Sequence, residues 1–182
     1  MGGSCRGFRA ARTTTVTLHV IGGPDNVALP TRDVAADVVH YAGAFEFGGG
    51  VRHLRFAASD LTAVSPVFAW DRNRWRVDTR YTYSRSAFDV TGESRGDHSV
   101  LLRGTRQQWR RVALQGAYAY GIESFADLTA DRVGALGTTT LATGTRIDLK
   151  SLTRIVATWE HQWRSNSTSI ERLTVAAIQV IR

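Results

Sequence analysis

The feature that most restricts the fold of this chain is a two-residue alternation of polar and apolar side chains, repeated along most of the sequence with almost no helical periodicity. The clearest case is residues 75–85, WRVDTRYTYSR, where Trp75 and Tyr81 share one parity and Arg76 and Arg80 share the other. Successive side chains of a β-strand point to opposite faces of its sheet. The pattern therefore predicts strands with one apolar face and one polar face.

Ten segments show this alternation, and residues typical of turns separate them. They are 13–21, 34–47, 51–58, 64–70, 75–85, 98–107, 111–122, 138–149, 152–164 and 169–181. Short connections at 48–50, 71–74, 108–110 and 150–151 alternate with longer ones at 59–63, 86–97 and 123–137. This order predicts consecutive antiparallel hairpins, with tight turns at one end of the sheet and loops at the other. Residues 1–12, which are basic and rich in small side chains, are predicted to be a disordered tail or a misassigned gene start, so the domain covers 13–182.

Strand length and aromatic position favour a membrane barrel over a soluble barrel or sandwich. The clearest segments run about 10–13 residues, longer than the ~5–6 of globular sheets and close to the ~9–11 that a tilted strand needs to cross a bilayer. The aromatic residues on the apolar parity lie near strand ends, as expected for belts at the two membrane–water interfaces. The predicted belt residues are Phe45, Phe47, Trp70, Trp75, Tyr81, Tyr83, Tyr118, Tyr120, Trp159 and Trp163.

The fold predicted is all-β, an antiparallel up-and-down transmembrane β-barrel with about ten strands visible in this chain. Short turns lie on the periplasmic side of bacterial barrels and long loops lie outside. With ten strands, both ends of the domain would fall on the periplasmic side.

The charge of the chain has two interpretations. The formal net charge is +7, and Lys150 is the one lysine among 23 basic residues. Such a balance suggests a nucleic-acid ligand, but the arginines are spread over the predicted strands rather than gathered in one patch. We interpret them as facing a polar lumen beside carboxylates, where they form either a structural ladder of ion pairs, which we favour, or an anion-selective surface. The predicted lumen residues are Arg76, Asp78, Arg80, Arg103, Arg146, Asp148, Arg154, Glu160 and Arg164.

No catalytic or metal-binding motif stands out. The five histidines have no ligand spacing such as HExxH, and a single cysteine, Cys5, excludes an internal disulfide. The one compact set of nucleophile, base and acid is Asp97-His98-Ser99, whose neighbouring side chains would point to opposite faces of a strand. We therefore predict no enzymatic activity, no metal and no cofactor.

Three segments carry a resemblance to a known family. They are Glu46 with the following Gly-x-Arg-x-Leu-x-Phe stretch that ends at Phe56, the Arg-Tyr-x-Tyr strand at Arg80–Tyr83, and the Tyr-Gly-x-Glu segment at Tyr120–Glu123. In their order and spacing, from about residue 34 onward, the chain resembles the YaiO-like family of outer-membrane β-barrel proteins of Gram-negative bacteria. Full members of the family carry a signal peptide and further strands before this region, so the resemblance implies the C-terminal part of a longer gene product.

Taken together, these observations predict an integral protein of the cell outer membrane with a structural, narrow-pore or surface-binding role. Its expected partners are outer-membrane lipid and the barrel assembly machinery, with an anionic glycan or lipopolysaccharide as a further candidate and no nucleic acid. Two other functions remain open: a barrel enzyme acting on lipid or glycan at the outer membrane, and a soluble basic β-barrel that binds nucleic acid or a small ligand.

Overall fold

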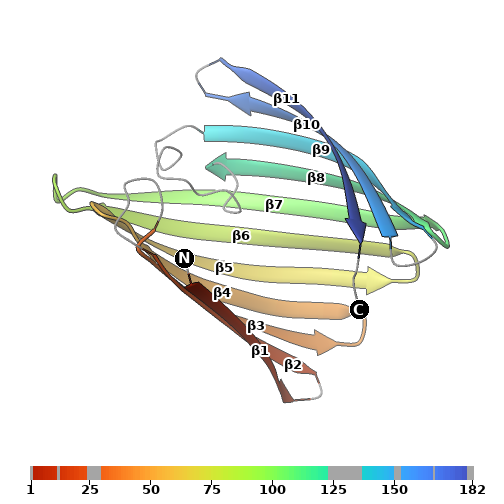
Figure 1. The fold of residues 1–182 in the computed structure, drawn as a ribbon, viewed down its shortest axis with the longest axis horizontal. Coiled ribbons are helices and arrows are strands. Elements are labelled where there is room, and N and C mark those ends of the chain that lie inside the picture. The colour runs from red at the N-terminus through yellow and green to blue at the C-terminus, as the bar shows by residue number, and fades with distance from the viewer. Residues whose placement is uncertain are drawn as a thin grey trace.

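The protein is a single antiparallel sheet of eleven strands, arranged in the order of the chain (Figure 1). The computed structural model describes residues 2–11, 13–23, 30–122, 137–149, 153–165 and 167–179, with side chains placed from residue 13 onward. The all-β, up-and-down prediction is confirmed. The strands are β1 (Gly2–Ala11), β2 (Thr14–Gly22), β3 (Arg32–Ala42), β4 (Phe45–Arg55), β5 (Ser59–Arg72), β6 (Trp75–Phe88), β7 (Ser94–Trp109), β8 (Val112–Ile122), β9 (Gly137–Asp148), β10 (Thr153–Arg164) and β11 (Ser169–Gln179).

Each strand pairs with the strand before it and the strand after it, and β1 and β11 form the two edges. Within the described residues, these two edge strands do not pair with each other, so the sheet is curved but open (Figure 1). No helix in the described part of the chain is long and apolar enough to cross a membrane.

The amino-terminal segment differs from its predicted state. Gly2–Ala11 forms β1 and pairs with β2 in register from Gly2 opposite Gly22 to Ala11 opposite Thr14. This strand raises the number of strands to eleven. Gly2 therefore lies at the end of the sheet where the longer connections are, the loop end, and Gln179 lies at the end with the tight turns, the turn end. With β1 added, the two ends of the described chain lie at opposite ends of the sheet, whereas the domain predicted from residue 13 onward begins and ends at the turn end, at Thr14 and Gln179.

The run of three glycines at 48–50 lies inside β4, although the sequence predicted a turn there. The β3–β4 turn is at residues 43–44, where Gly43 has a φ of 63°. Two of these glycines, Gly48 and Gly50, instead allow close approach to β3. A Cβ atom at Gly48 would lie 2.6 Å from the carbonyl oxygen of Val38, and one at Gly50 would lie 2.2 Å from a carboxylate oxygen of Asp37.

The position of the turn at 43–44, instead of 48–50, also changes the face on which some β3 side chains lie relative to those of β4. Uninterrupted alternation through the predicted strand 34–47 places Val39 and Tyr41 on the same face as Phe45 and Phe47, but their register partners are Gly48 and Glu46, which lie on the other face. A one-residue change in position moves a side chain to the opposite face of a strand.

The predicted loops at 59–63 and 86–97 belong mostly to strands, which leaves connections of only 56–58 and 89–93. In the first, Leu61 and Ala63 continue the alternation of β5 and are buried with Leu54 and Phe56 in a small apolar cluster. The predicted loop at 123–137 and the turn at 150–151 lie outside the described residues, apart from Gly137, which begins β9.

The two faces of the sheet differ in chemistry. One face, which is convex, exposes apolar side chains on nearly every strand, from Leu18 on β2 to Val175 on β11. The concave face carries charged, hydroxyl and small side chains, and several of them are buried, including Asp33, Asp78, Thr82 and Ala113. This distribution is the reverse of a soluble barrel, which buries its apolar face.

Candidate lumen site

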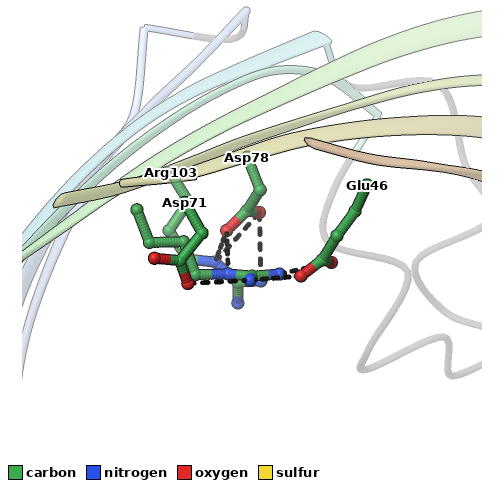
Figure 2. Close-up of polar contacts among 5 residues, drawn as sticks. Glu46, Asp71, Asp78 and Arg103 are labelled. Carbon is green, nitrogen blue, oxygen red and sulfur yellow. Dashed lines mark hydrogen bonds and ion pairs between the residues drawn. The ribbon is translucent and has the colours of Figure 1, made fainter. Parts of the chain in front are cut away.

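A group of ion pairs occupies the concave face near the turn end of β4 to β7 (Figure 2). The guanidinium of Arg76 donates to both carboxylate oxygens of Glu46, with N–O distances of 2.6 and 2.8 Å. Asp71 lies 3.5 Å and Asp78 4.0 Å from the same guanidinium. Arg76 is therefore held by three carboxylates from three strands, β4, β5 and β6.

Strand register explains this convergence. Glu46 is opposite Ala69, and Ala69 is opposite Asp78, so the three positions form a row across β4, β5 and β6. Ala69, at 1% exposed, is too small to block the space above it, and Glu46 reaches across it to Arg76. Arg103 on β7 is opposite Asp78 and donates to both of its carboxylate oxygens at 3.1 Å.

A second group of ion pairs lies on β9 and β10. Asp148 accepts a hydrogen bond from Arg154 at 2.6 Å and lies 3.5 Å from the guanidinium of Arg146. Arg146 also donates to the side-chain oxygen of Gln107 on β7 at 3.4 Å. The ion-paired groups thus continue along the concave face from β4 to β10.

Sequence reasoning missed a further ion pair, separate from these two groups, between Arg52 on β4 and Asp33 on β3. Its two hydrogen bonds measure 3.0 and 2.7 Å, and Asp33 is 3% exposed. Neither residue was among the predicted lumen residues, nor were Glu46 and Asp71. The displaced turn at 48–50 hid the β3–β4 register, in which Ala35 is opposite Arg52 and Asp33 is two positions away on the same face.

A cavity of about 310 Å³ lies on the concave face between β6 and β10. Arg80 lines it from β6 and Glu160 from β10, and no hydrogen bond or ion pair of either side chain is found within the described residues. Ala117, Ala119 and Tyr120 of β8 line the cavity, and the two alanines, which lie on the concave parity, are small enough to leave space in its middle. Hydroxyl and amide side chains complete the wall: Thr82, Ser99, Thr138, Thr140 and Gln162.

The structure brings all the predicted charged residues to the concave face. The paired ones are described above, Arg80 and Glu160 line the cavity, and Arg164 donates to Gln162 at 3.3 Å. The predicted aromatic residues all share the convex parity. Phe45 and Phe47 contact Phe68 at the turn end, with ring centroids 6.0 and 5.4 Å away.

The tyrosines form a second level toward the loop end. Tyr81 and Tyr83 pack around His98 on the convex face, and the Tyr81 hydroxyl lies 2.5 Å from His98 Nδ1. Tyr83 is eight residues beyond Trp75 on β6, which corresponds to roughly 26 Å along a strand. Ser99 lines the concave cavity, so the sheet separates it from His98. Among the described residues, no three His, Cys, Asp or Glu side chains gather in a way that could hold a metal ion.

Comparisons with known proteins support the fold and no closer relationship. No family model matches the chain, and no curated protein sequence matches it. Solved structures of similar fold include two of OmpT and one of a porin. OmpT, an outer membrane protein of Vibrio cholerae, aligns in its loop L8 deletion mutant with a TM-score of 0.75 and 11% identity over 96% of this chain. The in-vitro folded OmpT aligns with a TM-score of 0.69 and 10% identity over 97%.

The third structure is an anion-selective porin from Comamonas acidovorans, with a TM-score of 0.67 and 9% identity over 96% of this chain. The chain spans 61%, 60% and 54% of the lengths of the loop-deletion OmpT, the in-vitro folded OmpT and the porin, respectively. At such low identity the likeness is one of architecture. The chain has the fold of outer-membrane β-barrel proteins.

Proposed function

We propose that this chain is an integral β-barrel protein of the Gram-negative outer membrane, without enzymatic activity, whose concave face lines a narrow polar lumen. The observation that carries this proposal is the continuous apolar convex face. It runs across the sheet and leaves large side chains such as Phe47, Leu102 and Trp163 about half exposed. A lipid environment accounts for such a face, because monomeric soluble proteins rarely expose contiguous apolar patches of more than a few hundred Å².

Two further observations support the proposal. Aromatic side chains form one level at the turn end and another at the loop end, and the roughly 26 Å between Trp75 and Tyr83 along β6 gives a height of about 20 Å for a strand tilted by roughly 35–45°, which lies within an apolar band about 25 Å tall. Among the similar solved structures, OmpT is described as an outer membrane protein and the third structure as an anion-selective porin. The relationship to the YaiO-like family, which rests on the three sequence segments, is part of the same proposal.

The lumen we propose is narrow and close to electrically balanced. Arg52, Arg76, Arg103 and Arg154 each have a carboxylate within ion-pair distance on the same face. The favoured role of these residues is structural, because pairing removes the free charge that would select an ion. The cavity beside Arg80 and Glu160 is the part of this surface left open to a solute. The partners proposed are membrane lipid and the assembly machinery, and lipopolysaccharide or an anionic glycan on the loop side.

Lipid dependence tests this function. We expect the refolded chain to float with lipid vesicles, to resist carbonate extraction and to migrate differently on a denaturing gel before and after heating. In planar bilayers, a lumen that is open, narrow and close to electrically balanced should give small single-channel conductance steps with weak ion selectivity. A chain that is folded and monomeric in plain buffer, and that does not float with vesicles, would show that the proposal is wrong.

A further inference from the structure

Five arginines gather on and beside two neighbouring hairpin connections at the turn end of the sheet. They are Arg72, Arg74, Arg106, Arg110 and Arg111, called here the arginine collar, and all five are exposed. Strand register brings Arg72 and Arg106 close together, because Trp75 is opposite both Arg72 on β5 and Arg106 on β7. The backbone N–H of Gln107 donates to the carbonyl oxygen of Arg74 at 2.7 Å, which fixes the β5–β6 turn against β7.

The collar differs from the concave face because its charges are not neutralised. Within the described residues, no carboxylate lies within ion-pair distance of any collar guanidinium. The nearest acidic residue in the sequence, Asp71, directs its carboxylate to Arg76 on the concave face. The lumen was expected to account for the positive charge of the chain, but its ion pairs nearly balance, and the collar carries a large part of the excess.

Aromatic rings lie directly beside the collar. The Arg106 guanidinium is 5.0 Å from the ring centroid of Trp75, which is 46% exposed on the convex face. Trp109, next to Arg110, is 63% exposed, and Phe45 and Phe68 lie nearby on the convex face. Tryptophan prefers the headgroup level of a bilayer, and an arginine just beyond that level reaches the phosphates.

We infer that the arginine collar binds anionic phospholipid headgroups of the leaflet on the turn side of the sheet. This inference rests on the proposed function. A guanidinium matches a phosphate through two parallel hydrogen bonds. Five guanidiniums with no carboxylate partner among the described residues, on and beside two adjacent turns, give a surface that prefers negatively charged lipid over zwitterionic lipid.

Tryptophan quenching by brominated lipid tests the inference. The full chain is placed in phosphatidylcholine vesicles that contain either brominated phosphatidylglycerol or brominated phosphatidylcholine at the same mole fraction. Trp70, Trp75 and Trp109 lie at the turn end and report on lipid there. We expect roughly threefold stronger quenching by the anionic lipid, and loss of most of this excess in about 0.5 M salt.

The test variant combines Arg72→Gln, Arg74→Gln and Arg110→Gln and leaves Arg106 on its tryptophan. The matched control, Arg32→Gln with Arg85→Gln and Arg95→Gln, removes the same charge at the loop end. The inference predicts that only the collar variant loses the preference. Equal loss in both variants, or no preference in the unmodified chain, would overturn it. If the chain does not float with vesicles at all, the proposed function fails as well, so flotation distinguishes the two failures.

Discussion

At the scale of single residues, the glycines of β4 show how closely the strands approach one another. Gly48 and Gly49 are neighbours in sequence, but they differ in the space around them. A Cβ at Gly48 would lie 2.6 Å from backbone oxygen of Val38, whereas one at Gly49 would lie no closer than 3.4 Å to its nearest atom. A glycine is therefore required at position 48 and not at position 49.

We expect Gly48→Ala to lower the free energy of unfolding by about 1–3 kcal/mol, because backbone of β3 must move to admit the methyl group. Gly49→Ala serves as the control and should change stability by less than about 1 kcal/mol. Urea unfolding in lipid vesicles, followed by tryptophan fluorescence, measures both. Equal stability of the two variants would contradict the close approach.

A second prediction concerns the ion pairs of Asp78. This carboxylate is 11% exposed and accepts two hydrogen bonds from Arg103. Asp78→Asn leaves one oxygen to accept them and removes the charge, so we expect a loss of about 1–2 kcal/mol in the free energy of unfolding. Asp71, 56% exposed and 3.5 Å from Arg76, provides the comparison.

Asp71→Asn should cost no more than about 0.5 kcal/mol, since exposed pairs contribute little. The same urea titration compares the two substitutions. A larger loss in the free energy of unfolding for Asp71→Asn than for Asp78→Asn would show that burial does not determine which of these ion pairs contributes more to stability.

Sequence alone predicted which parity is charged, and the structure places Arg76, Arg103 and Arg154 accordingly. It did not predict their partners. Which carboxylate pairs with which arginine depends on strand register, and register depends on where each turn begins. One displaced turn was enough to hide Asp33, Arg52 and Glu46 from the predicted site.

At the scale of strands, the sequence predicted the face on which the side chains of β6 to β10 lie, but it did not predict the residues at which the strands begin and end. Alternation persists along the whole length of a strand, so it fixes the face of each side chain without marking the end of the strand. Two of the tight turns begin at single residues with positive φ, Gly43 at 63° and Asn73 at 60°. One glycine or asparagine is a weaker sequence signal than the run at 48–50, which misled the prediction.

The two faces of β7 allow a direct comparison between adjacent residues. Leu102 is 46% exposed on the convex face, and Leu101 lines the concave cavity. An arginine on a lipid-facing position costs about 2–4 kcal/mol near the bilayer centre. We expect Leu102→Arg to reduce the yield of heat-modifiable, vesicle-bound protein sharply, and Leu101→Arg to be tolerated because its side chain enters the concave cavity that Glu160 also lines. The reverse order of effects would mean that the convex face contacts water.

At the scale of the whole molecule, the two open edges determine what the sheet does in lipid. β1 and β11 each pair with one neighbour, which leaves a row of backbone groups on their outer sides. Each unsatisfied backbone group in hydrocarbon costs several kcal/mol. A sheet that spans a membrane therefore pairs both edges.

We expect the amides of β1 and β11 to be as protected from hydrogen exchange in vesicles as those of β5 to β7. Exchange followed by mass spectrometry, at several protein-to-lipid ratios, measures this protection. Protection that persists on dilution in lipid indicates pairing within one chain. Rapid exchange of alternate amides in β1 and β11 would contradict membrane spanning by this sheet.

The strand order has a consequence for how the chain folds. Every strand pairs with its neighbours in the sequence, so each new pairing closes only the short loop that joins two consecutive strands. Short loops cost little closure entropy, and local contacts form fast. The sheet can therefore grow as a zipper, one hairpin after another, and a hairpin is the unit by which such a chain can be lengthened or shortened without changing the pairing of the remaining strands.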